Sequence, residues 1–199
     1  MKKTIFTVIF LLLIIVSRVN AQAVWGLRAG LCIPQISSKA SSTNVSNFGW
    51  EVGPVLYWSL KNDFYINSGV MFNMKNIKIS NSTGEMTLRT SNIEVPLYLG
   101  LSFGQKNKVS FYAQAGPYFG LKVSEDENLN SAQYSVQDSE NLDFINTFNA
   151  GLGVMYGINF NRFKLELGYK YGVTNFIKSQ VNDNNVNLSA WFFGISYVF

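Results

Sequence analysis

The feature that most constrains the fold of this 199-residue chain is an alternation of apolar and polar residues with a period of two. Successive side chains of a β-strand point to opposite faces, so this pattern predicts strands with one apolar and one polar face. In one such segment, Phe48, Trp50 and Val52 share a face, while Glu51 and Gly53 share the other. No stretch repeats apolar residues at helical spacing. The sequence therefore predicts an all-β chain.

Eight segments of this kind follow one another along the chain. They span residues 25–33, 48–60, 64–75, 93–103, 111–123, 148–160, 163–174 and 191–199. Short turns are predicted at 61–63, 104–108 and 161–162, and loops at 81–84, 124–142 and 178–186. An even number of strands with alternating short and long connections is typical of bacterial outer-membrane barrels. Pro54 predicts a bulge or a local break in the second strand.

The period alone also fits a soluble up-and-down barrel, whose apolar rows point inward around a ligand. Here the polar rows are dense in glycine, as expected of a narrow and crowded lumen. The apolar rows carry Trp and Tyr near the strand ends, as in the aromatic belts at membrane interfaces. We therefore expect an eight-stranded antiparallel up-and-down transmembrane β-barrel, and a soluble lipid-carrying barrel is the weaker alternative.

The first residues predict export from the cytoplasm. Lys2 and Lys3 precede an apolar run at 4–16, and Val19-Asn20-Ala21 offers small-residue spacing for cleavage before Gln22. The run is shorter than the roughly 20 residues of a membrane-spanning helix. We expect residues 1–21 to be a cleaved signal peptide and residues 22–199 to be a single barrel domain.

The chain closes on an aromatic strand, in which Phe193, Ile195, Tyr197 and Phe199 fall on alternate positions. Four segments within the predicted strands then carry a resemblance to a known family. They are 26–31 (GLRAGL), 93–100 (IEVPLYLG), 113–120 (AQAGPYFG) and 165–172 (LELGYKYG). Together they resemble the PorT-type outer-membrane β-barrel family common in Bacteroidetes, over nearly all of the mature chain.

The resemblance implies a place in the outer membrane, in contact with its lipid, and assembly by the barrel-assembly machinery. It assigns the assembly signal to Tyr197 and Phe199 in the last strand. Members linked to gliding or protein secretion imply, by analogy, a contact with another envelope protein.

The charge balance argues against a nucleic-acid partner. Lys2, Lys3 and Arg18 account for three of the 16 basic residues, which leaves 13 in the mature chain against 12 acidic residues. Nucleic-acid binding needs clustered Lys and Arg, and the sequence has no such stripe.

The residue types needed for common catalytic sites are also missing. The sequence has no histidine, which excludes triads and dyads that use histidine as the base. With Cys32 as the one cysteine, a typical zinc site and an intramolecular disulfide are excluded too. No glycine-rich phosphate loop opens a helix. We expect neither an enzyme nor a bound cofactor.

Six charged residues on the polar rows form the candidate site. They are Arg28, Glu51, Glu94, Lys122, Glu166 and Lys170. An unpaired charge inside a narrow barrel is costly, so we expect these side chains to pair across the lumen. Because eight strands leave room for little more than side chains, a packed polar plug is favoured over a gate or ion path.

A second candidate is the polar segment 124–143. It holds Glu125, Asp126, Glu127, Asp138, Glu140 and Asp143 and no Lys or Arg. Calcium binds such oxygens, but the spacing does not match an EF-hand, and a solvated surface loop is favoured.

The combined sequence evidence predicts a non-enzymatic outer-membrane barrel with a structural or partner-binding role. The alternative is a small pore or transport-assisting barrel.

Overall fold

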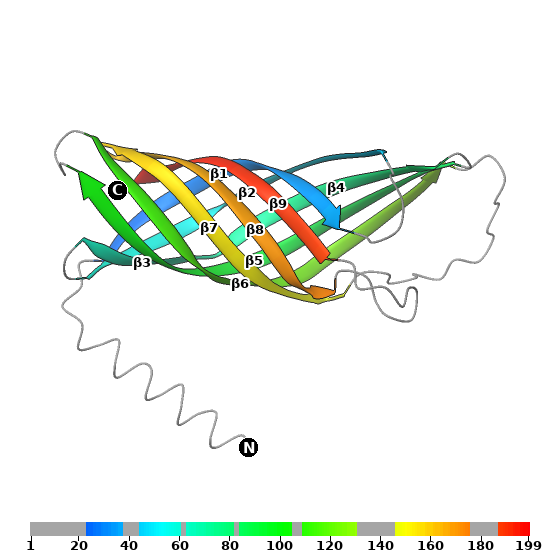
Figure 1. Ribbon diagram of the computed structural model, residues 1–199. Helices are drawn as coiled ribbons and strands as arrows, with labels where there is room; N and C mark the ends of the chain where they lie inside the picture. Colours follow the sequence, from blue (N-terminus) through cyan, green and yellow to red (C-terminus); the bar gives the residue numbers. More distant parts are fainter. Residues whose placement is uncertain are drawn as a thin grey trace, which may run out of the picture.

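The computed structural model describes residues 23–37, 44–60, 63–81, 84–104, 109–130, 146–175 and 187–199. They form one antiparallel sheet that closes into a barrel (Figure 1). Its strands are β1 (Ala23–Ser37), β2 (Asn44–Ser59), β3 (Phe64–Gly69), β4 (Met71–Asn81), β5 (Gly84–Gly104), β6 (Val109–Asn130), β7 (Phe148–Phe160), β8 (Phe163–Asn175) and β9 (Asn187–Val198). The predicted signal peptide lies outside the described residues.

Pairing of β1 with both β2 and β9 closes the ring. β3 and β4 together fill one place between β2 and β5, so the ring has eight strands. The predicted antiparallel barrel of eight strands is confirmed. No helix among the described residues is long and apolar enough to cross a bilayer.

Val70 interrupts what the sequence predicts as a single third strand. β3 and β4 keep one register with β2 and β5 on both sides of this residue. That register places Pro54 opposite Val70 and Pro96 opposite Gly69, and a proline has no N–H to donate. The Val70 amide still donates to the Pro54 carbonyl at 3.1 Å. The break predicted at Pro54 thus occurs in the neighbouring strand, while β2 itself continues.

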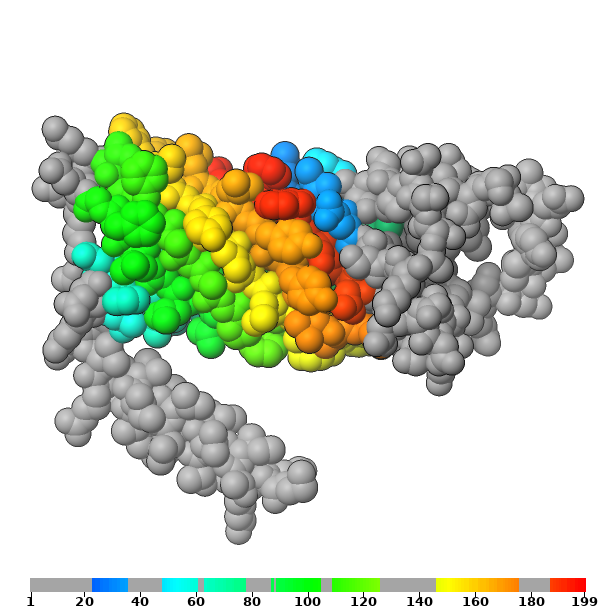
Figure 2. All heavy atoms as spheres, in the orientation of Figure 1, coloured from blue at the N-terminus to red at the C-terminus, as the bar shows by residue number. Residues whose placement is uncertain are grey.

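The apolar rows face outward and the polar rows face the lumen. In β5, Leu97 and Leu99 are exposed on the outer wall, whereas Glu94 and Tyr98 are buried inside. Figure 2 shows the side chains of β6, β7, β8 and β9 packed into a continuous wall on one face. A soluble barrel that carries lipid in an apolar interior needs the opposite arrangement, so that alternative is wrong.

Short turns join the strands at the end of the barrel where the C-terminus lies (Figure 1). Asp63 and Asn161 have φ angles of 64° and 54°, and Gly104 has a φ of 114°. These values lie at positive φ, where Asn, Asp and Gly are the most tolerant residues. Short turns mark the periplasmic end of a bacterial outer-membrane barrel.

A band of aromatic side chains surrounds the outer wall at this periplasmic end. Its exposed members are Trp25, Phe64, Phe103, Phe111, Phe160, Phe163 and Phe199. Aromatic residues gather at the level of the lipid headgroups. The band therefore marks the periplasmic interface of the membrane.

At the opposite end, β4, β5 and β6 reach farther than their neighbours (Figure 1). The prediction of a loop from Ser124 onward is wrong for its first part, because β6 continues to Asn130, which pairs with Glu85 of β5. The outer row changes character here: Asn76 and Arg89 are polar and hydrogen-bond to each other at 3.0 Å. Beyond the lipid the outer row no longer needs apolar residues. The alternation of apolar and polar residues is therefore lost there, although the backbone pairing of the strands continues.

Inward glycines make room for tyrosine rings on the neighbouring strand. A Cβ atom on Gly100 would lie 2.2 Å from Cζ of Tyr65, and one on Gly157 would lie 2.4 Å from Cζ of Tyr112. Tyr118 covers Gly151 in the same way, and Tyr98 of β5 reaches Gly153 of β7, which is two strands away. The glycine-rich polar rows thus reflect a lumen filled with large rings.

A charge on the outer wall tests the placement of the membrane. Leu99 lies near the middle of the outer row of β5, and Leu99→Arg should destabilise the folded barrel by about 2–4 kcal/mol. Thr87→Arg on the same row, beyond the apolar band, should cost less than about 1 kcal/mol. Equilibrium unfolding by guanidinium in lipid vesicles measures both, and equal losses would contradict this placement.

Candidate functional site

The ion pair nearest the periplasmic end joins β1 to β8 across the lumen. Arg28 Nε lies 2.6 Å from Glu166 Oε2, and Arg28 Nη2 donates to Glu166 Oε1 at 3.0 Å. The same Nη2 donates to Asn67 Oδ1 at 3.2 Å, and the Tyr112 hydroxyl donates to Glu166 Oε1 at 2.7 Å. Arg28 is completely buried. Two parallel contacts plus these neutral donors and acceptors offset the cost of removing both charges from water.

A second ionic cluster lies four residues farther along β8. The Lys170 ammonium contacts Glu51 Oε2 on β2 at 2.7 Å and also pairs with Glu94 on β5. Asn73 Nδ2 donates to Glu94 Oε2 at 3.3 Å, and Asn92 Nδ2 donates to Asn73 Oδ1 at 3.2 Å. One lysine therefore connects three strands of which no two are neighbours in the ring.

An apolar layer separates these two ionic clusters. Tyr98, Met155 and Phe192 are fully buried and pack together. Met155 and Phe192 both pair in register with Gly168, which lies midway between Glu166 and Lys170 on β8. Between the two ionic clusters, the described side chains thus fill the lumen in successive layers.

The structure brings five of the six predicted lumen charges into these two clusters. Arg28 joins Glu166, and Lys170 joins the two carboxylates of Glu51 and Glu94. The sixth, Lys122, pairs with Glu125 three residues along β6, near the outer end. Sequence spacing alone does not assign these partners, because they depend on the tilt of the strands around the ring.

The sequence analysis missed the neutral groups that complete the network. Asn67 and Tyr112 contact the pair of Arg28 and Glu166. Asn73 and Asn92 belong to the network around Glu94 and Lys170. All four occupy inward positions of the period-two pattern. Their inward position in the alternating pattern, together with their hydrogen-bonding side chains, was the signal that could have identified them.

The acidic segment provides no metal site in the part of the chain that the structure describes. Glu125, Asp126 and Glu127 belong to β6, whereas Asp138, Glu140 and Asp143 lie outside the described residues. Among described residues, no group of three or more His, Cys, Asp or Glu side chains could hold a metal ion.

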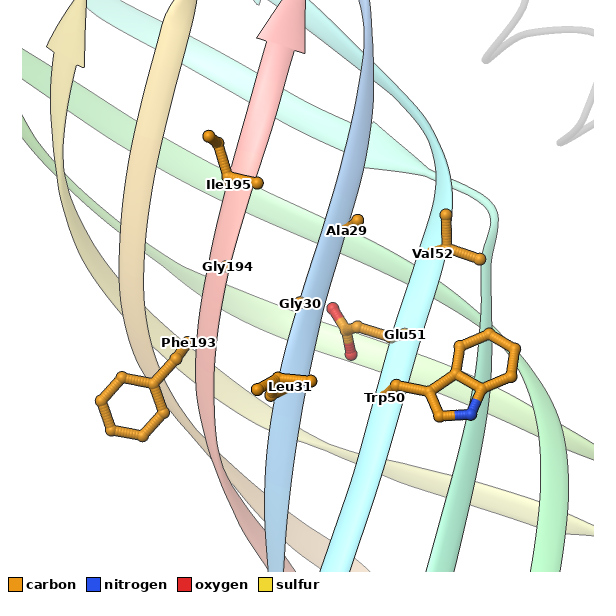
Figure 3. A pocket seen from close by; sticks show the side chains of 9 residues that line it. All are labelled: Ala29, Gly30, Leu31, Trp50, Glu51, Val52, Phe193, Gly194 and Ile195. Atoms are coloured by element: carbon orange, nitrogen blue, oxygen red, sulfur yellow. The ribbon is translucent and has the colours of Figure 1, made fainter.

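The outer wall has shallow apolar depressions that face the lipid. In one of them, Ala29 on β1 lies between the larger side chains of Val52 on β2 and Ile195 on β9 (Figure 3). Glu51 lies behind this wall, on the inner row. The small outward side chain explains the depression, and the lipid-facing wall is otherwise apolar there.

The closing strand places the predicted assembly signal at the periplasmic edge. Phe199 is 71% exposed, and its amide donates to the Trp25 carbonyl at 2.9 Å. The Tyr197 ring packs edge-on against Phe199 and Phe163, with centroids 5.4 and 5.1 Å apart. The terminal aromatic residues are therefore accessible from outside the barrel.

The cluster of Lys170, Glu51 and Glu94 predicts a large stability cost when Lys170 is removed. Lys170→Met leaves Glu51 and Glu94 buried and close together, and should lower the free energy of unfolding by about 3–5 kcal/mol. Adding Glu51→Gln and Glu94→Gln should recover much of the loss. Arg89→Met, outside the lumen, is the control and should change it by less than about 0.5 kcal/mol. Unfolding in vesicles measures all three, and a neutral effect of Lys170→Met would contradict the pairing.

The terminal strand generates a kinetic prediction. Phe199→Ala should slow barrel assembly, since the machinery is expected to read the last aromatic residue. Phe160→Ala removes another exposed ring at the same end and should leave the rate unchanged. Pulse-chase assembly followed by heat-modifiable gel mobility gives both rates, and equal rates would count against a special role of Phe199.

Several solved structures are similar to this chain. A search of curated sequences finds no match. The crystal structure of Neisserial surface protein A is 17% identical, with a TM-score of 0.48, and covers 88% of this chain and 97% of its own. Ail, the attachment invasion locus protein of Yersinia pestis, is 14% identical, with a TM-score of 0.43 and coverages of 89% and 99%. The outer membrane enzyme PagL is 7% identical, with a TM-score of 0.48 and coverages of 86% and 98%.

The family to which the chain belongs follows from a sequence model. The model described as outer membrane protein beta-barrel domain matches residues 20–178, which is well over half of the chain. The matched region includes β1 to β8, with both ionic clusters. The chain therefore belongs to the outer membrane protein beta-barrel domain family, and its place is the outer membrane.

Proposed function

We propose that this protein is a closed, non-enzymatic barrel that acts by contact with another component of the envelope. The observation that carries the proposal is the layered lumen, in which Arg28 and Lys170 are held by carboxylates of the barrel itself. Side chains held in this way stabilise the barrel and are not free to act on a substrate. The outer loops and the periplasmic rim remain as the surfaces that meet a partner.

The absence of histidine supports a role without catalysis. PagL, one of the similar structures, is an outer membrane enzyme. General bases that work near neutral pH are most often histidines, and this sequence has none.

A partner among the secretion or gliding machinery is the more specific form of the proposal. It rests on the resemblance of four strand segments to the PorT-type barrels, and this resemblance remains an analogy. Outer-membrane lipid and the barrel-assembly machinery are the other contacts that such a protein needs.

Site-specific cross-linking in cells tests the partner. A photoreactive residue replaces Arg162 at the periplasmic turn or Arg89 on the outer rim, and Leu99 on the lipid-facing wall serves as the control position. A stoichiometric envelope protein captured from Arg162 or Arg89, and not from Leu99, supports the proposal. Capture of the assembly machinery alone from both rims would indicate a barrel that stands by itself.

The rival function, a small pore, predicts a different electrical behaviour. We expect no large and stable conductance in planar bilayers, because the ionic and apolar layers fill the lumen. Glu51→Gln is the matched variant: in an ion path, loss of this charge would change the cation preference, whereas in a plug the current stays at the background. A stable conductance whose selectivity follows Glu51 would establish the pore.

A further inference from the structure

A single lysine at the periplasmic end of the lumen has an unusual environment. Lys164 is the second residue of β8, and its ammonium lies over three tyrosine rings. Its Nζ is 3.8 Å from the ring centroid of Tyr57, 4.7 Å from that of Tyr112 and 5.1 Å from that of Tyr65. These rings come from β2, β6 and β3, so the fold assembles an aromatic cage around this one cation.

Arg28, Lys122 and Lys170 pair with carboxylates, whereas Lys164 pairs with none among the described residues. Within the described part of the chain it makes no hydrogen bond and no ion pair. The nearest lumen carboxylate, Glu166, is already held by Arg28 and by the Tyr112 hydroxyl. Contact with aromatic faces offsets only part of the cost of withdrawing an ammonium from water. At this end of the lumen Arg28 thus has an ion-pair partner, and Lys164 has none among the described residues.

A pocket of about 180 Å³ lies beside this lysine at the periplasmic mouth. Its polar lining includes the hydroxyls of Ser59 and Ser102 and the amide of Asn159. Asn159 Nδ2 donates to Ser110 Oγ at 2.9 Å, and its Oδ1 is buried without a hydrogen-bond partner among the described residues. The mouth therefore combines an ammonium without an ion pair among the described residues, hydrogen-bonding groups and room for a small polar group.

We propose that the periplasmic mouth binds a carboxylate, which supplies the missing partner of Lys164. A singly charged anion fits better than a phosphate dianion, since one ammonium is available and the carboxylate of Asp63 already lines the same pocket. The serine hydroxyls can donate to the second carboxylate oxygen. That the carboxylate belongs to a polypeptide rests on the proposed function, whereas binding of the carboxylate itself does not.

Titration of the folded protein in detergent micelles tests the site directly. With tyrosine rings labelled with carbon-13, acetate should shift the ring signals of Tyr57, Tyr65 and Tyr112 in a saturable way. Acetamide, which has the same shape and no charge, should not. Lys164→Met should weaken acetate binding by about tenfold or more, the effect of losing a charged hydrogen bond. Lys122→Met, at the other end of the lumen, should leave it unchanged.

A further measurement checks that the variants fold. Heat-modifiable gel mobility shows that both variants fold, and Lys164→Met should be at least as stable as the parent because it removes a charge without a partner. Absence of saturable shifts with acetate, equal shifts with acetamide or chloride, or equal binding by Lys164→Met would overturn the proposal.

A second arm identifies the source of the carboxylate. A photoreactive residue at Leu60, on the rim of the pocket, should capture a periplasmic polypeptide in cells, and Lys164→Met should abolish the capture. Acetate binding without this capture would assign the site to a small carboxylate molecule. Failure of acetate binding, with cross-links still formed from Arg162, would refute the pocket and leave the proposed function standing.

Discussion

The whole structure depends on the pairing of the first and last strands. In hydrocarbon a backbone N–H or C=O group finds no water, so an open sheet edge is not tolerated. The register of β1 with β9 runs from Gly26 opposite Val198 to Ser37 opposite Asn187 and removes both edges. Once the sheet is closed, each strand has one face toward lipid and one toward a narrow interior. The apolar rows therefore face outward and the polar rows inward, which is the reverse of a soluble barrel.

The interior solves a second problem, which is how to bury charge in a space that holds little water. Glycine on one strand and tyrosine on the next fill the volume, as at Gly100 and Tyr65. The charges then compensate one another in two small groups held by neutral amides and hydroxyls. Lys164 departs from this arrangement, because its ammonium contacts tyrosine rings at the periplasmic mouth and no carboxylate among the described residues.

Much of the fold could be predicted from sequence because the lipid enforces the alternation. Leu97 and Leu99 had to be outside, and Glu94 and Tyr98 inside, once the period was recognised. The prediction failed where the lipid ends: the polar residues from Ser124 to Asn130 resemble a loop, although their backbone continues β6. The partners of the lumen charges could not be derived from the sequence, since they depend on strand tilt and register around the closed ring. The cage around Lys164 has the same origin, because its rings come from β2, β3 and β6, which are distant from Lys164 in the sequence.

The apolar layer of Tyr98, Met155 and Phe192 has a consequence for the electrical properties of the molecule. It lies at the level of Gly168, between the two ionic clusters, and acts as an internal septum of low dielectric constant. An ion moving along the barrel axis would have to leave its polar partners and cross a constriction that repels water. Passage of ions is therefore opposed at this level, whereas the electric field is not: a medium of low dielectric constant screens charge less than water does, so the two ionic clusters act on each other through the layer.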